Sequence, residues 1–250
     1  PIEAASLNVK CDQDDIIFRC NLVTLNDSIM TDFTSGHITT EESTQLINEL
    51  NDAFSGTSIR FISGVSYRHI VLLSNKFSTL STCAPHDITD KLVESYFPHG
   101  QNDDYMTTFL SKARAILASS QVNKKRIENG QLPATDIWPW SQGLMPTLPS
   151  FKETYNKTGG IVTAVDLLKG LAVLTDLEAP NVIGATGVID TNYQAKVDAT
   201  FDILSRHDFV YLHVEAPDEC GHMGDAKLKT EAIEAFDKHI VGPMLKYQMN

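Results

Sequence analysis

Apolar and polar positions follow two different patterns along this chain, and each pattern predicts its own kind of fold. Residues 16–25 are rich in β-branched and apolar side chains, which predicts a strand. Thr39 and Glu42 have the spacing of a capping box, so a helix is expected to begin there. Residues 59–74 predict one long strand, or two strands that meet at Gly64.

A second helix is expected over residues 104–126, where basic residues gather at the C-terminal end that the helix dipole makes favourable for cations. Prolines interrupt the pattern between residues 138 and 149, and helical and strand-like segments alternate after them. The helical segments are 164–176, 193–206 and 227–245, and the strand-like segments are 181–187, which ends in a glycine turn, and 209–215. This alternation predicts a parallel sheet flanked by helices, so we place a domain boundary near residue 145.

The composition is that of an ordinary globular protein, with 42% hydrophobic and 21% charged residues among 250. No apolar run approaches the roughly 20 residues that span a bilayer, and residues 1–10 lack the pattern of a signal peptide. The four cysteines are scattered and form no C-x-x-C pair, which is typical of a reducing compartment, so we expect a cytoplasmic protein. Because the chain begins with Pro1 and not with Met, we expect a processed or truncated piece.

The charge balance narrows the classes of partner. The 20 Lys and Arg residues oppose 32 Asp and Glu residues, which gives a net charge of −12. Phosphate backbones repel such a chain, so no nucleic acid partner is expected. No polybasic stretch favours anionic lipid, so no membrane partner is expected either. A small anion stays compatible with this charge where local Arg or Lys side chains or helix N-termini hold it.

The segment after the expected strand 209–215 carries the candidate chemistry of the chain. Sites in open α/β sheets form at the carboxyl ends of strands, and Asp218 and His222 lie just beyond this one, across a glycine-containing turn. A carboxylate and an imidazole at this spacing can reach one divalent cation, and they suit zinc, manganese or iron, or magnesium where oxygen ligands dominate. The alternative is a solvated loop aspartate beside a helix-capping histidine, since D-x-x-x-H alone is a weak pattern.

A longer stretch gives this pair its context. The run V-E-A-P-D-E-C-G-H-M-G-D at residues 214–225 resembles the metal motif of cofactor-independent phosphoglycerate mutases, in their archaeal branch. Further segments resemble that branch in the same order: 1–5, 18–24, 35–42, 64–69, 85–91, 137–143, 164–170 and 184–196. The resemblance therefore covers nearly the whole chain.

The resemblance implies an α/β fold of the alkaline-phosphatase-like superfamily, with an incomplete parallel sheet flanked by helices and an inserted α+β lid domain. It implies that residues 14–145 form the lid, which binds phosphoglycerate, and that residues 1–13 and 146–250 form the incomplete metal-binding domain. The implied reaction interconverts 2-phosphoglycerate and 3-phosphoglycerate through a phosphoserine, in glycolysis and gluconeogenesis, with Mn, Mg, Zn or Co ions. In such enzymes a metal activates the serine, and a closing lid excludes water.

The sequence departs from the family's pattern at both ends. The nucleophilic serine segment and an Asp-Gly metal ligand are expected before Pro1, and further Asp and His ligands are expected after Asn250. Asp218 and His222 are the metal ligands that match the motif here, and no residue of the chain matches the catalytic nucleophile. Two ligands rarely hold a catalytic ion firmly. We therefore expect that the chain alone neither transfers phosphate nor binds metal tightly.

A small trianion such as phosphoglycerate needs convergent cationic side chains. The candidates within residues 14–145 are Arg19, Arg68, His69 and His37. Arg19, Arg68 and His69 lie in strand-like runs, where burial of an unpaired charge would be costly. His37 stands just before an expected helix N-terminus, which favours anions. The alternatives are that the arginines pair with carboxylates of the same domain, and that His37 is an ordinary turn residue.

Other polar and aromatic residues have plainer interpretations. Trp138 and Trp140 are expected to pack at the domain junction. Lys196 is expected to be a solvated charge on a helix face, and residues 124–126 a basic helix end. His213 is interpreted as a hydrogen-bonded core residue, with a role behind the metal ligands as the alternative.

Two other functions stay open from the sequence. One is a related hydrolase of phosphate or phosphonate esters, which the lid-like segment disfavours. The other is a non-catalytic domain that binds phosphoglycerate or a partner, which the unmatched nucleophile favours.

Overall fold

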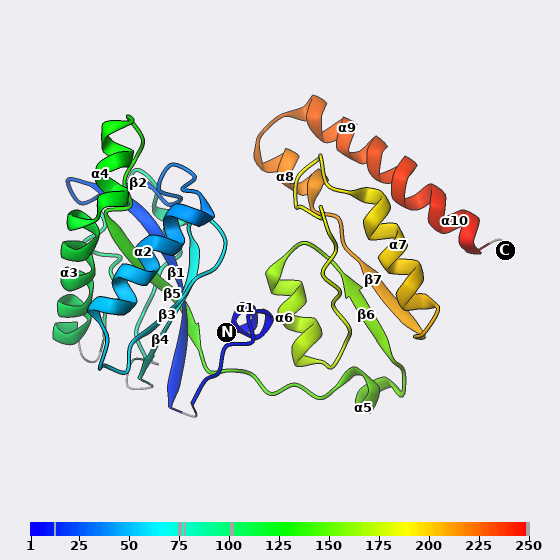
Figure 1. Ribbon diagram of the computed structural model, residues 1–250, viewed down its shortest axis with the longest axis horizontal. Helices are drawn as coiled ribbons and strands as arrows, with labels where there is room; N and C mark the ends of the chain where they lie inside the picture. Colours follow the sequence, from blue (N-terminus) through cyan, green and yellow to red (C-terminus); the bar gives the residue numbers. More distant parts are fainter. Residues whose placement is uncertain (13, 75–76, 78, 101–102, 249–250) are drawn as a thin grey trace. The chain divides into compact units, whose positions relative to one another are not determined.

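The chain folds as two compact units (Figure 1). The computed structural model describes residues 1–12, 14–74, 77, 79–100 and 103–248. The first unit comprises Pro1 and Val9–Met145, and the second comprises Ile2–Asn8 and Pro146–Asn250. Within the described residues, no helix combines the length and the apolar character needed to cross a lipid bilayer.

A five-stranded sheet with antiparallel pairing forms the centre of the first unit. Its strands are β1 (Asp15–Asn26), β2 (Ile29–Asp32), β3 (Arg60–Ile62), β4 (Arg68–Ser74) and β5 (Asp136–Gly143). The long strand β1 pairs with β4 along one edge and with β5 along the other, and its last residues pair with β2. The strand predicted from the apolar run 16–25 is therefore confirmed.

The apolar segment 59–74 forms two strands, β3 and β4, which pair with each other. Gly64 lies in the connection between them, where a Cβ atom would stand 2.1 Å from the carbonyl oxygen of Arg68. The backbone N–H of Gly64 also donates to Nδ1 of His69, at 3.1 Å. A side chain at position 64 would clash with the Arg68 backbone, so this close approach of the two strands requires glycine.

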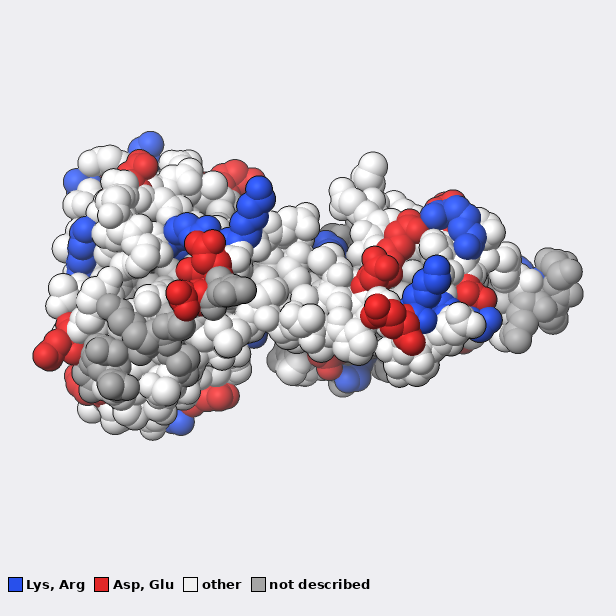
Figure 2. Space-filling view, turned by 90° about the horizontal axis from the view of Figure 1, so that it is seen from below, with Lys and Arg blue, Asp and Glu red and all other residues white. Residues whose placement is uncertain are grey.

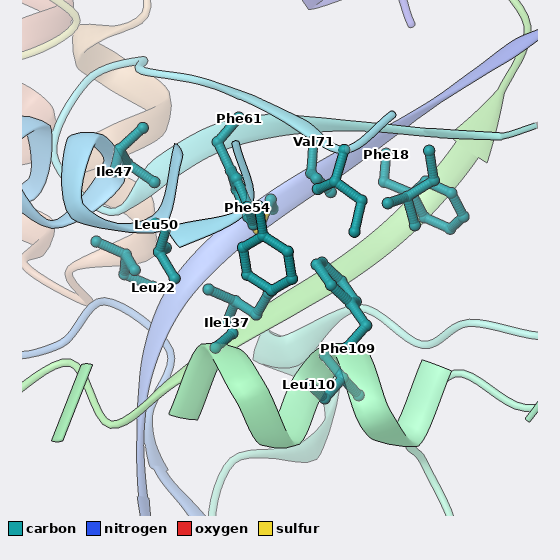
Figure 3. Close-up of a cluster of buried hydrophobic side chains, with 14 of the residues drawn as sticks. Phe18, Leu22, Ile47, Leu50, Phe54, Phe61, Val71, Phe109, Leu110 and Ile137 are labelled. Atoms are coloured by element: carbon teal, nitrogen blue, oxygen red, sulfur yellow. The ribbon is translucent and has the colours of Figure 1, made fainter. Parts of the chain in front are cut away.

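The main core of the first unit lies between the sheet and its helices (Figure 3). The helices are α2 (Thr40–Ala53), α3 (Asp103–Ser119) and α4 (Gln121–Glu128). Phe18 and Leu22 of β1 are fully buried in one cluster with Leu50 of α2 and Phe109 of α3. Because alternate residues of a strand point to opposite faces, this places the even-numbered residues of β1 against the helices.

The helix boundaries depend on side-chain caps. The expected capping box is present: Oγ1 of Thr39 accepts from the N–H of Glu42, and the Glu42 carboxylate accepts from the N–H of Thr39. The single helix expected over 104–126 is wrong. Ser120 has an extended backbone and its Oγ accepts from the N–H of Val122 at 3.1 Å, so it ends α3 and caps α4.

The second unit is built on two parallel strands, β6 and β7, in register from Gly159 opposite Phe209 to Val162 opposite Leu212. Its elements are α1 (Ile2–Ser6), α5 (Phe151–Tyr155), β6 (Gly159–Val162), α6 (Asp166–Leu174), α7 (Tyr193–Leu204), β7 (Phe209–Leu212), α8 (Ala216–His222), α9 (Ala226–Phe236) and α10 (Gly242–Gln248), with a π-helical turn over Asp237–Val241 between the last two. Helix α7 packs on both strands, and α1 packs on α6 (Figure 1). The predicted parallel pairing of strands flanked by helices is confirmed.

The second unit also departs from the sequence pattern. The strand expected over residues 181–187 is wrong: these residues form a loop with a turn at residues 183–184, and Ile183 is 84% exposed. The sequence pattern missed β6, whose two glycines argue against a strand. The glycines are needed for close packing, since a Cβ at Gly159 would stand 2.6 Å from the carbonyl oxygen of Phe209, and one at Gly160 would stand 2.8 Å from the side chain of Ile203.

Candidate functional site

Asp218 and His222 lie on one face of helix α8, which begins just after β7. The segment is a helix and not the glycine-containing turn expected from the sequence; Pro217 fits because a first-turn residue needs no N–H partner. Residues four apart on a helix lie above one another, and Nε2 of His222 stands 3.2 Å from Oδ2 of Asp218. Both side chains are open to solvent, 75% and 68% exposed. The structure thus brings the two predicted metal ligands together.

This pair fits two positions in the shell of a divalent cation, because an exposed carboxylate oxygen and an exposed imidazole nitrogen lie 3.2 Å apart. Over the described part of the chain, no group of three or more His, Cys, Asp or Glu side chains is placed to hold a metal ion. Two protein ligands give weak binding. The pair is therefore suitable as a part of a metal site.

A second polar group lies close to the start of α8. Nε2 of His213 contacts Oε2 of Glu215 at 3.2 Å, and its Nδ1 lies 3.3 Å from Oγ1 of Thr163. The Thr163 oxygen in turn accepts from the N–H of Val165, which leaves its hydroxyl hydrogen for His213. His213 is therefore a hydrogen-bonded residue that contacts Thr163 through Nδ1 and Glu215 through Nε2.

Lys196 differs most from its expected role as a solvated charge. Its side chain is fully buried, and Nζ donates to the carbonyl oxygen of Thr186 at 3.1 Å. Burial lowers the pKa of Lys196, and the negative charge of Glu215 opposes that shift. The signal in the sequence was its position, since Lys196 lies on the same helical stripe as the buried residues Val197 and Thr200.

In the first unit, Arg19 and Arg68 lie on the sheet face opposite the main core. Arg68 stands across from Asn21, two residues from Arg19 on the same strand, so the two arginines share this face. The Arg19 guanidinium lies 4.3 Å from the ring centre of Trp140, whose Nε1 donates to Oδ1 of Asn21. The sequence pattern missed this role of Trp140 and Asn21, which only the register between β1 and β5 reveals.

The structure separates His69 from Arg68. His69 is paired with Cys20 on the core face and is 3% exposed. Burial lowers its pKa to about 4. Its Nε2 has no hydrogen-bond partner. Buried and neutral, it is unsuited to contact an anion from solvent, and this is the physical reason to correct its predicted role. His37 is exposed, with a left-handed backbone, before the N-cap of α2.

The two tryptophans also have distinct environments. Trp138 is fully buried in a smaller cluster with Val23 and Met30, and its Nε1 donates to the carbonyl oxygen of Cys83.

On the face that Figure 2 shows, Lys and Arg side chains lie among Asp and Glu side chains. Among the described residues of that face the charges of both signs are mixed, so an anion there would depend on a few local cations and not on a broad basic field.

Two families match this sequence. Residues 1–123 match the family described as 2,3-bisphosphoglycerate-independent phosphoglycerate mutase, and residues 74–248 match the metalloenzyme superfamily. The chain is 41% identical to the 2,3-bisphosphoglycerate-independent phosphoglycerate mutase of Methanosarcina mazei, over 100% of the chain and 63% of the relative. It is 43% identical to the same enzyme of Methanosarcina barkeri, over 99% of the chain and 62% of the relative.

A solved structure from Pyrococcus horikoshii has the same fold at 23% identity, with a TM-score of 0.73 over 97% of this chain and 58% of that one. The chain spans about 62% of the length of the curated relatives it matches. These similarities confirm the resemblance and the fold class that the motifs predicted. The chain belongs to the metalloenzyme superfamily, and its residues 1–123 are similar to the family of 2,3-bisphosphoglycerate-independent phosphoglycerate mutases.

Proposed function

We propose that this chain is part of a metal-dependent phosphoglycerate mutase, which interconverts 2-phosphoglycerate and 3-phosphoglycerate in the cytoplasm. The observation that carries the proposal is the 3.2 Å contact between Asp218 and His222, beyond the end of a parallel strand. The relatives at 41% and 43% identity bear the mutase name, which favours this function over hydrolysis of phosphate or phosphonate esters.

In the proposed enzyme, Asp218 and His222 are two ligands of a divalent ion, for which manganese, magnesium, zinc and cobalt are the candidates. When bound, such an ion neutralises negative charge on a transferring phosphoryl group. The chain's own contribution is to hold one oxygen and one nitrogen donor on a short helix whose first turn is fixed by the backbone of Glu215.

The first unit is proposed to bind the glycerate part of the substrate. Arg19 and Arg68 share one sheet face, and the ring of Trp140 restricts the Arg19 guanidinium. A planar guanidinium that is held in place loses less entropy when it binds a carboxylate or phosphate. His37 is exposed beside the first turn of α2 and is a further candidate contact.

Titration calorimetry with 3-phosphoglycerate tests the substrate site. We expect Arg68→Ala to weaken binding by about ten-fold or more, the usual effect of losing one charge-assisted hydrogen bond. Lys125→Ala is the matched control, since Lys125 is an exposed cation of the same unit. Equal affinities for the parent, Arg68→Ala and Arg19→Ala would refute the substrate site.

Broadening of amide NMR signals by Mn²⁺ tests the metal ligands, because it detects weak binding. We expect broadening around Asp218 and His222 that is lost in Asp218→Asn. Glu231→Gln is the control, since Glu231 is an exposed carboxylate of the neighbouring helix. If 3-phosphoglycerate binds but Mn²⁺ leaves these signals sharp, the result supports the alternative of a non-catalytic binding domain.

A further inference from the structure

The buried amino group of Lys196 is the most unusual charge in the second unit. A buried ammonium is unfavourable unless carbonyl oxygens and a negative charge compensate it. Lys196 has both: Nζ donates to the carbonyl oxygen of Thr186 at 3.1 Å, and the carboxylate of Glu215 lies near enough to stabilise its charge. The compensation comes from the residues that surround the start of α8.

The side chain of Glu215 lies beside the same stretch of backbone. An added Cβ at Gly187 would stand 3.7 Å from Cβ and 3.8 Å from Cγ of Glu215, which are ordinary contact distances. Gly187 directly follows Thr186, the residue that accepts from Lys196. Lys196 therefore binds one residue of the 184–190 loop, and the side chain of Glu215 lies next to the following one.

Glu215 is also the residue from which α8 begins. Its carbonyl oxygen accepts from the N–H of Asp218 at 2.8 Å and from the N–H of Glu219 at 3.2 Å. Its side chain is held by His213, which is itself held by Thr163. Any movement of Glu215 is thus passed directly to the turn that carries Asp218.

We propose that Lys196 is a positioning residue that, together with Glu215, fixes the first turn of α8 and with it the direction of the Asp218 and His222 side chains. This inference rests on the proposed role of that pair as metal ligands. Residues that orient ligands affect metal affinity by about 10–100-fold in known sites. Helix α8 buries Ala216 and Cys220 against Ala232 of α9, and this packing fixes the helix on one side, while the contacts of Glu215 fix its first turn.

The first test needs no metal. NMR measurement of amide hydrogen exchange follows the N–H groups of Asp218 and Glu219, which are protected by Glu215. We expect Lys196→Met to speed their exchange several-fold relative to β6 and β7, which report the stability of the unit as a whole. Lys169→Met is the control, because Lys169 is paired with Asp166 on α6 and is only partly buried.

The second test adds Mn²⁺ as the probe. In Lys196→Met and in Glu215→Gln, we expect about ten-fold more Mn²⁺ to be required for half-maximal broadening of the His222 amide. A purely structural role in the core would lower the thermal midpoint without changing this signal in the folded protein. The effect of the double variant should be smaller than the sum of the two single effects, because both residues act on one turn.

The outcomes are separable. Unchanged exchange at Asp218 and Glu219 in folded Lys196→Met and Glu215→Gln would overturn the inference, whatever Mn²⁺ does. If Mn²⁺ leaves the parent's signals sharp, the proposed metal function fails, and amide exchange still decides the role of Lys196. If Lys196→Met does not fold, Glu215→Gln decides it, because the 24% exposed Glu215 side chain tolerates an amide of the same shape.

Discussion

The buried Arg126 gives the sharpest prediction about the stability of the first unit. Its side chain is 2% exposed, and each of its nitrogens has a partner in the fold. Nε donates to the carbonyl oxygen of Leu132, Nη2 donates to that of Ser35, and Nη1 binds Oε2 of Glu42 at 2.5 Å. The same Glu42 oxygen accepts from the N–H of Thr39 in the capping box of α2.

Arg126→Met removes these bonds while retaining much of the apolar volume. It leaves two carbonyl oxygens without their donor and removes the cation beside the Glu42 carboxylate, and loss of one partner of a buried pair costs about 3–5 kcal/mol. Glu42 is 28% exposed and can take up water, which moves the expected loss toward the lower limit, about 3 kcal/mol. Lys125→Met is the control on the same helix, with an expected change within about 0.5 kcal/mol because Lys125 is exposed.

Urea unfolding followed by tryptophan fluorescence is the appropriate assay. Both tryptophans of the chain, Trp138 and Trp140, lie in the first unit, so the signal reports that unit alone. The loss should persist in high salt, because a buried pair is poorly screened. A loss below about 1 kcal/mol for Arg126→Met would refute the reasoning, since it would mean that water replaces the guanidinium without penalty.

Three further predictions concern pH and packing. Burial lowers the pKa of His69 from 6.5 to about 4, so as pH falls the unfolded chain takes up this proton before the folded chain does. The free energy of unfolding, followed by tryptophan fluorescence, should therefore fall as pH drops from about 6.5 toward 4. In His69→Gln this fall should be smaller. Gly170→Ala would place a Cβ 2.0 Å from the carbonyl oxygen of Ile2, so α1 should detach and limited proteolysis near the N-terminus should accelerate. Hydrogen bonds from Arg206 hold the pKa of Glu178 below its ordinary value; this stabilisation should disappear as pH falls through that pKa, and Glu178→Gln should narrow the difference between melting midpoints at neutral and acidic pH.

Sequence patterns predicted the helices and strands that are determined by residues close together in the sequence. The capping box of Thr39 and Glu42 starts α2, and the apolar run of β1 forms the central strand, because both depend on residues near in sequence. Strand β6 was missed for the opposite reason. Its glycines are unfavourable in an isolated strand and become necessary only when Phe209 and Ile203 pack against them. Such a requirement comes from residues far along the chain and leaves no local trace.

The same distinction between local and distant determinants applies to the residues of the candidate site. The spacing of Asp218 and His222 was sufficient to predict a shared face, and the helix supplies that face even though a turn was expected. The partnership of Arg19 with Trp140 was not predictable, because it depends on the register that sets residue 19 opposite residue 140. His69 was misjudged because alternation along β4 turns it to the core face while its neighbour Arg68 stays exposed.

The two buried cations explain why charge patterns alone misled in both units. Lys196 was expected to be solvated and Arg126 to belong to a basic helix end, and each is instead buried against backbone carbonyl oxygens. Each also lies near a glutamate at the start of a helix, Glu42 in the first turn of α2 and Glu215 at the N-cap of α8. A cation at the start of a helix opposes the helix dipole, so its place there has to come from hydrogen bonds that order the backbone. Removal of either cation is therefore expected to change the local geometry at these two helix starts more than the net charge of the chain.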